Sequence, residues 1–178
     1  MNVIKEIQNL ILESNNNFLN LNHEEFLNYL NTKIDYGFID KNNKIYKESE
    51  LESKSWYDNY TLQIKDRLSK TKIGHCWDFV ELERYYFNYH KIPNNSYFLC
   101  DPELTLTHTL LIYNNNYWIE SAWYKKKGIR KINNIKDVWE IYKNHHKKEV
   151  HMWKYNEPKF AMKQNDFINF CTKGKPVL

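Results

Sequence analysis

Cys76 stands where a thiol gains reactivity, at the predicted start of a helix. Gly74, just before it, lets the backbone turn sharply into that helix. A thiol in the first helical turn lies beside N–H groups that have no intrahelical acceptor and beside the positive end of the helix dipole. Both favour the thiolate, which is the nucleophilic form of cysteine. The segment therefore predicts a nucleophilic thiol, and the remaining sequence must supply its base.

His108 and Glu120 are the candidate base and its orienting acid. His108 lies near the start of a predicted strand over residues 105–113, and Glu120 lies in the next predicted strand, over residues 117–123. A carboxylate on an apolar strand is costly to bury without a partner, and a hydrogen bond from an imidazole would satisfy it. The same bond would hold the ring in the tautomer that faces the thiol. Cys76, His108 and Glu120 thus form a predicted set of nucleophile, base and orienter.

The turn between the two strands sets a geometric condition on this set. Asn114–Asn116 is the predicted turn, and a three-residue loop would place Tyr113 opposite Tyr117. His108 and Glu120 would then be diagonal neighbours on one face, about 7–8 Å apart. A two- or four-residue loop without a bulge would put them on opposite faces. We therefore expect an odd-length loop or a compensating bulge, a hydrogen bond between the Glu120 carboxylate and the His108 ring, and the other ring nitrogen facing the thiol.

Other side chains that could do chemistry are assigned structural roles. His75 adjoins the thiol, but neighbouring side chains on a helix do not face each other, so it is expected to be peripheral, with at most an influence on the thiol pKa. Asp78 is a first-turn acid of the kind that the helix dipole favours. Cys100 and Cys171 are expected to be packing residues, since cysteine is among the most buried residue types. Three further histidines show no pattern of metal ligands and are expected at a solvated helix end: His145, His146 and His151.

Composition narrows the class of protein. The chain has 178 residues, of which 42% are hydrophobic and 16% aromatic, so it can bury a core and is not expected to be disordered. Its net charge of +4 is mildly basic and does not by itself demand nucleic acid. The three cysteines include no C-x-x-C pair, which argues against a disulfide framework and against structural zinc. No apolar run approaches a membrane span, so a cytosolic, reducing setting is expected.

The predicted elements give an α+β pattern in one domain over residues 1–178, with a helical N-terminal part over 1–69. Amphipathic helices are expected over residues 3–13 and from about Asn22, where Glu25 completes a capping-box pattern. Residues 48–69 are expected to be helical in part.

The second part is predicted as a helix on a mainly antiparallel sheet. The Cys76 helix is expected to turn Glu81 and Arg84 outward. Three tryptophans are expected in the core or in a cleft wall: Trp77, Trp118 and Trp123. Strands are predicted over residues 96–100, 105–113, 117–123 and 129–132, a helix after Asn133 or Asn134, and a short helix near Phe167–Phe170, whereas the tail from Val150 is ambiguous.

Three segments together resemble the transglutaminase-like cysteine enzymes of the papain-like superfamily: Gly-His-Cys-Trp-Asp at residues 74–78, Thr-His-Thr-Leu-Leu-Ile-Tyr at 107–113, and Tyr-Trp-Ile-Glu-Ser-Ala-Trp at 117–123. The resemblance covers about residues 70–132. It implies Cys76 as nucleophile, His108 as general base and acid, and Glu120 as orienter, although the acid is more often Asp in that family. The Cys76 N–H is the expected oxyanion donor, and Gln63 is a weaker candidate for a second one.

The resemblance implies a thiol enzyme that attacks an amide or ester carbonyl and forms a thioacyl intermediate. Water would complete hydrolysis, or an amine acceptor would complete transfer, and the sequence leaves both open. The expected partner is a peptide or protein amide substrate, with no metal, organic cofactor or membrane.

Two interpretations from other classes stay open. One is a catalytically inactive member of the family that binds peptides or proteins. The other is a nucleic-acid-associated domain that uses the basic stretch of Lys125–Lys127, Arg130 and Lys131. A solvated loop is the preferred interpretation of that stretch, because the net charge is modest and no nucleic-acid motif is present.

Overall fold

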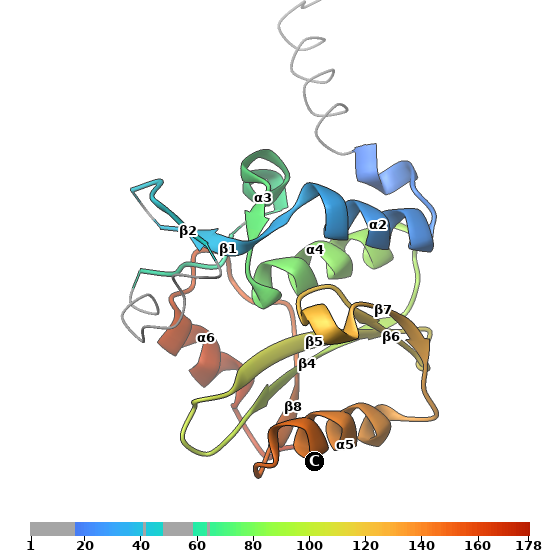
Figure 1. Cartoon of the computed structure of the whole chain (residues 1–178), viewed down its shortest axis with the longest axis vertical. Helices are drawn as coiled ribbons and strands as arrows, with labels where there is room; N and C mark the ends of the chain where they lie inside the picture. The colour runs from blue at the N-terminus through green and yellow to red at the C-terminus, as the bar shows by residue number, and fades with distance from the viewer. Residues whose placement is uncertain (1–16, 41, 48–58, 64) are drawn as a thin grey trace, which may run out of the picture.

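The computed structural model describes residues 17–40, 42–47, 59–63 and 65–178 (Figure 1). The predicted helix over 3–13 lies outside these ranges, as do residues 48–58 of the stretch that was expected to be helical in part. The described chain is α+β, with a helix packed on a mainly antiparallel sheet, as the sequence predicts. Among the described residues, no helix is both long and apolar enough to cross a membrane.

The elements before Cys76 form a layer of short helices around a small sheet with the strand order β2-β1-β3. They are η1 (Asn17–Asn20), α2 (His23–Lys33), β1 (Asp35–Ile39), β2 (Ile45–Lys47), α3 (Lys65–Thr71) and β3 (Ile73–Gly74). The predicted capping box at the start of α2 is confirmed, because the Glu25 N–H donates to Asn22 Oδ1 at 3.0 Å and the Asn22 N–H donates to Glu25 Oε2 at 2.8 Å.

The remaining elements build the larger sheet, whose strand order is β7-β6-β5-β4-β8 and whose pairs are all antiparallel. They are α4 (Cys76–Tyr89), β4 (Asn94–Cys100), β5 (Thr107–Tyr113), β6 (Tyr117–Glu120), η4 (Tyr124–Lys126), β7 (Gly128–Lys131), α5 (Ile135–His146), β8 (His151–Tyr155) and α6 (Gln164–Cys171). The strand β8, on which the sequence was ambiguous, adds to the outer side of β4.

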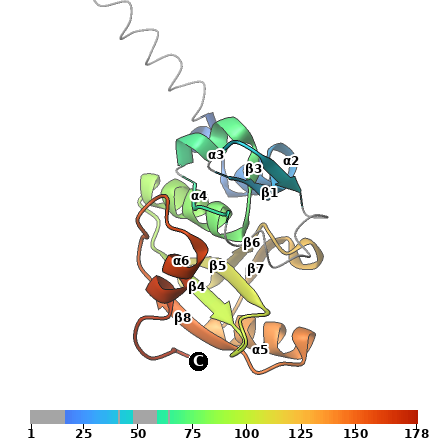
Figure 2. The same cartoon turned by 90° about the vertical axis from the view of Figure 1, so that its left-hand side faces the viewer.

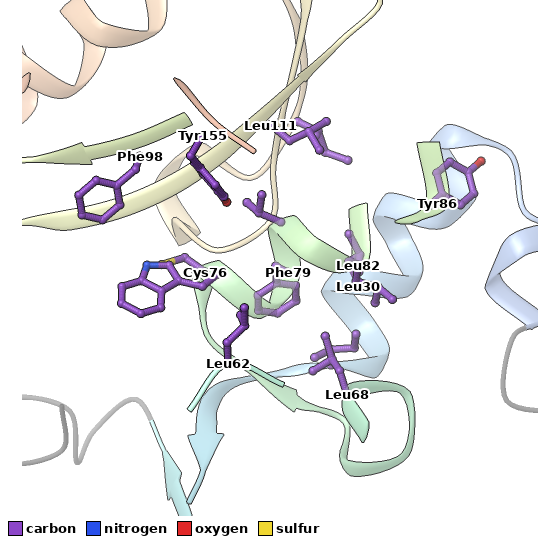
Figure 3. Packing of buried hydrophobic residues seen from close by; sticks show 14 of the residues in the cluster. Leu30, Leu62, Leu68, Cys76, Phe79, Leu82, Tyr86, Phe98, Leu111 and Tyr155 are labelled. Atoms are coloured by element: carbon purple, nitrogen blue, oxygen red, sulfur yellow. The ribbon is translucent and has the colours of Figure 1, made fainter. Parts of the chain in front are cut away.

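The two faces of the larger sheet are covered by different helices (Figures 1 and 2). The helix α4 lies between one face and the N-terminal layer, and α5 lies against the other face. Each face has its own apolar core. Leu82 and Phe79 of α4 pack with Leu111 of β5 in the first core (Figure 3), and Val138 of α5 packs with Leu110 of β5 in the second.

The turn between β5 and β6 has the predicted length. Tyr113 pairs with Tyr117, which leaves the three-residue loop Asn114–Asn116. Asn114 and Asn115 adopt positive φ angles of 47° and 65°, which asparagine tolerates better than most residues. The register that places His108 and Glu120 on one face is therefore confirmed.

The entry into α4 depends on Gly74 for a reason other than the predicted sharp turn. Gly74 is not among the described residues with positive φ, but a Cβ atom there would lie 2.8 Å from Leu68 Cδ1 and 3.2 Å from the Cβ atom of Asp78. Glycine at this position thus avoids a tight contact with the side chains of Leu68 and Asp78.

The prediction that Glu81 and Arg84 face solvent is wrong. Glu81 is 7% exposed and Arg84 is 9% exposed. Arg84 Nε donates to Glu81 Oε2 at 2.9 Å, and the Tyr155 hydroxyl of β8 donates to Glu81 Oε1 at 3.1 Å. The helix α4 is therefore central, and its polar stripe is buried as a hydrogen-bonded ion pair beneath β8.

Candidate functional site

Cys76 is the first residue of α4, and its thiol lies beside two imidazoles. Its Sγ is 3.2 Å from Nδ1 of His75, and the imidazole of His108 lies near enough to act on its pKa. Burial raises the pKa of the thiol, but the charge of His75 and the neighbouring imidazole of His108 outweigh burial and bring the pKa well below its ordinary value. The predicted activation of Cys76 is supported by these neighbours in addition to the helix start.

His108 bonds the carboxylate as the sequence predicts. Its Nε2 lies 3.0 Å from Glu120 Oε2, which leaves Nδ1 as the ring nitrogen available to the thiol. Burial lowers the pKa of His108, but the charge of Glu120 and the contact with Cys76 raise it to about 10. The opposite shifts at Cys76 and His108 favour a thiolate–imidazolium pair at neutral pH.

Glu120 is buried and fully hydrogen-bonded, at 2% exposure. Its Oε2 also accepts from the Tyr142 hydroxyl at 2.8 Å, and its Oε1 accepts from the N–H groups of Ala122 at 3.0 Å and Trp123 at 2.7 Å. Burial raises its pKa, but the positive charge of His108 and these hydrogen bonds lower it below the ordinary value. The same backbone bonds turn the chain after Glu120, which explains why β6 ends there and not at Trp123 as expected.

Tyr142 of α5 is a member of the site that the sequence did not reveal as one. It was identifiable only as an apolar-face residue of the predicted helix. In the structure its hydroxyl bonds Glu120, and its ring centre lies 5.1 Å from that of His108. The one signal in the sequence was chemical, since a tyrosine on a buried face needs a partner for its hydroxyl.

The prediction that His75 is peripheral is wrong. His75 is 6% exposed and has an extended backbone, with φ of −97° and ψ of 171°, because it precedes the first helical residue. The rule that adjacent helical side chains point apart therefore does not apply to the pair His75 and Cys76.

Asp78 and Gln63 hold the segment that carries His75. Asp78 accepts the N–H groups of His75 and Gln63, each at 2.8 Å, and burial raises its pKa to about 6. The Gln63 side chain donates to the Ile73 carbonyl at 2.7 Å and accepts from the Thr71 hydroxyl at 3.1 Å. Gln63 thus acts as a brace between β3 and α4, and its contacts favour this role over that of an oxyanion donor.

A second buried carboxyl group, that of Glu83, lies near Glu120. Glu83 of α4 is 1% exposed and accepts a short hydrogen bond from the hydroxyl of Ser121, the residue that follows Glu120. Burial raises the pKa of Glu83 well above its ordinary value, and the charge of Glu120 adds to this rise. The pKa of Glu83 is thus raised while that of Glu120 is lowered, so Glu83 holds its proton more readily than Glu120 does.

A pocket of about 630 Å³ opens onto His108. Trp123 lines it and is thus a cleft-wall residue, whereas Trp77 and Trp118 are core residues. His145 and His146 lie at the end of α5 as predicted, but they too line this pocket. Tyr36 also lines the pocket, whereas Cys76 is 1% exposed and does not line it.

The other two cysteines have the packing role that the sequence predicts. Both are buried. Burial raises the pKa of Cys100 to about 11, with a contribution from Asp101, and raises that of Cys171 still further. Cys76 is thus distinguished from Cys100 and Cys171 by its lowered pKa. No group of three metal-ligating side chains is found in the part of the chain that the structure describes.

Comparison of the chain with protein-family models, with curated proteins and with solved structures gave no match.

Proposed function

We propose that this protein is a thiol-dependent acyl-transfer enzyme of the transglutaminase-like, papain-like type, with Cys76 as nucleophile, His108 as general base and acid, and Glu120 as orienter. The observation that carries the proposal is the chain of groups formed by the thiol of Cys76, the imidazole of His108 beside it and the carboxylate that His108 bonds. Its supporting distances are 3.0 Å from His108 Nε2 to Glu120 Oε2 and 2.8 Å from the Tyr142 hydroxyl to the same carboxylate oxygen. Such a chain activates a thiol and fixes the tautomer of its base.

The reaction begins with attack of the Cys76 thiolate on an amide or ester carbonyl. The backbone N–H of Cys76 supports the oxyanion, because a first-turn N–H group has no intrahelical acceptor. The His108 imidazolium gives its proton to the leaving amine or alcohol, which leaves a thioacyl group on Cys76 and a neutral imidazole. The neutral imidazole then takes a proton from the attacking water or amine, and the acyl group leaves as an acid or as a new amide.

A substrate reaches the thiol from the pocket that opens onto His108. Tyr36 lines that pocket, and its ring centre lies 5.2 Å from that of His75. Because Cys76 is 1% exposed, the approach of a carbonyl group requires a covering side chain to move. The proposed substrate is a peptide or protein amide, and a reducing compartment such as the cytoplasm would keep the thiol free.

The experiment that tests the proposal is trapping of the thioacyl intermediate. The protein is mixed with p-nitrophenyl acetate, quenched in acid, and analysed by intact mass and peptide mapping. We expect acetyl transfer to Cys76, lost in Cys76→Ser, with the rate of p-nitrophenol release lower by roughly two orders of magnitude or more. Cys100→Ser is the matched control and should keep the rate. Equal p-nitrophenol release by wild type and Cys76→Ser would refute the proposed enzymatic activity. Tight peptide binding without acylation would favour the inactive binding module.

A further inference from the structure

The pocket beside His108 combines aromatic walls with basic groups. Tyr36, Trp123 and Tyr142 supply the walls, and Lys125 lines the pocket together with imidazoles of α5. The Trp123 ring lies 4.6 Å from that of Tyr142, centre to centre, so the wall beside the site is continuous.

The two imidazoles of α5 stand beside this wall. The ring centre of His145 lies 4.7 Å from that of Trp123, and His146 lies 4.8 Å from His145. Lys126, next to Lys125, places its Nζ 6.0 Å from the centre of the Trp123 ring. Positive or polar nitrogen groups thus stand beside Trp123 in the aromatic wall.

No described lining residue of this pocket is acidic. The nearby carboxylates are already bound elsewhere: Glu120 to His108 and Tyr142, and Asp101 to Lys148 at 2.8 Å. Among the described residues, Lys125 has no carboxylate within 4.0 Å. Its charge therefore acts on whatever enters the pocket.

We propose that the pocket selects acyl donors that carry an anionic group, with Lys125 as the specificity-determining charge and the aromatic wall holding the apolar part of the acyl group. This inference rests on the proposed function, because it places the reacting carbonyl at Cys76. A single positive charge about 8 Å from a ligand carboxylate, in the intermediate dielectric of a pocket, changes the encounter rate by roughly threefold to tenfold.

The test compares two small alkylating reagents that differ in charge at the same thiol. Iodoacetate is anionic and iodoacetamide is neutral, and both form the same kind of C–S bond to Cys76 with loss of iodide. Peptide mapping follows the rate of alkylation at Cys76 with each reagent. The iodoacetate rate is divided by the iodoacetamide rate, and the result is then divided by the same quotient measured for glutathione. General effects on the reactivity of the thiol cancel in this ratio.

We expect a ratio above one for the wild type and a ratio lower by roughly threefold to tenfold for Lys125→Gln. Lys159→Gln is the matched control, since Lys159 is exposed and does not line the pocket, and it should keep the wild-type ratio. Added salt should lower the wild-type ratio more than that of Lys125→Gln. A reactive Cys76 whose ratio is the same in wild type and Lys125→Gln would overturn this inference alone. Slow reaction with both reagents would overturn the proposed function and the inference with it.

Discussion

At the scale of residues, the thiol of Cys76 is governed by three groups that arrive from different parts of the chain. His75 precedes it directly, His108 comes from β5, and Glu120 comes from β6. Glu120 acts on the thiol only through His108, because its negative charge stabilises the imidazolium that stabilises the thiolate. Glu120 is in this sense a positioning residue, and the ionisation of the thiol should report on it.

Glu120→Gln tests whether the charge of Glu120 affects the ionisation of the thiol through His108. Glutamine keeps a side-chain oxygen for the N–H groups of Ala122 and Trp123 but removes the negative charge that raises the pKa of His108. We expect the pKa of Cys76 to rise, so that its alkylation by iodoacetamide near pH 6 slows by about tenfold or more, since one pKa unit is a factor of ten. The measurement is the rate against pH. Glu140→Gln, at an exposed glutamate of α5, is the control, and an unchanged profile in Glu120→Gln would remove Glu120 from the set.

The residues of the set were predictable because each differs chemically from the residues around it. Cys76 stands at a predicted helix start, and His108 and Glu120 stand on apolar strands. The three-asparagine turn then determined the face that His108 and Glu120 share. His75 and Tyr142 were assigned no role in the chemistry for physical reasons. The backbone of His75 is extended, which a helical rule does not describe, and Tyr142 reaches the site through tertiary packing of α5.

At the scale of elements, α5 supports the site from the sheet face opposite α4. Side chains alternate along β5, so His108 shares a face with Leu110, which packs in the core beneath α5. The Tyr142 hydroxyl is the polar contact from α5 to Glu120.

Tyr142→Phe should destabilise the protein through this contact. The substitution removes only the hydroxyl, so a buried carboxylate loses one of its donors, which costs about 2 kcal/mol. Urea unfolding measures the loss, with Tyr89→Phe as the control because Tyr89 is 57% exposed and should change by less than about 0.5 kcal/mol. Equal stability of Tyr142→Phe and wild type would mean that this hydrogen bond does not hold α5 to the sheet.

Elements with local signals were predictable from the sequence, and elements that depend on distant pairing were not. The capping box of α2 and the β5–β6 turn lie within a few residues of chain. The strand β8 pairs with β4 far along the chain, and its Lys154 interrupts the apolar pattern. Glu81 and Arg84 have the spacing of a solvent-facing stripe, and their burial depends on distant elements such as β8, whose Tyr155 bonds Glu81.

At the scale of the whole molecule, the site lies where three layers meet. The site is formed by the start of α4, by the end of β5 that carries His108, and by α5 (Figure 1). It therefore depends on the complete fold. The connection between β4 and β5 borders the pocket through Leu106. Asp101 holds that connection by accepting from the Leu106 N–H at 2.7 Å, from the Thr105 hydroxyl at 2.5 Å and from Lys148 Nζ at 2.8 Å.

Asp101 should make the stability of the fold depend on pH in acid. Burial raises its pKa, but the hydrogen bonds from Lys148, Thr105 and the Leu106 N–H outweigh burial and lower the pKa from 3.8 to about 2. A lowered folded-state pKa stabilises the fold above the unfolded value, and this contribution is lost as the pH falls from about 4 to about 2.

We expect Asp101→Asn to lower the free energy of unfolding by about 2 kcal/mol near pH 7, with the difference from wild type shrinking toward pH 2. Urea titrations at several pH values measure it. Asp166→Asn, at an exposed aspartate of α6, should stay within about 0.5 kcal/mol throughout. A difference that is the same at neutral and at acidic pH would show that the ionised carboxylate is not the source.

Competitive labelling of the three cysteines measures directly whether Cys76 is an activated thiol. The wild-type protein is treated with limiting iodoacetamide near pH 6, where an ordinary thiol with a pKa of about 8.5 is almost fully protonated, and the labelled positions are counted by peptide mapping. We predict that Cys76 takes the label and that Cys100, whose pKa burial raises to about 11, and Cys171 do not. Label at Cys100 or Cys171 with Cys76 unmodified would contradict it.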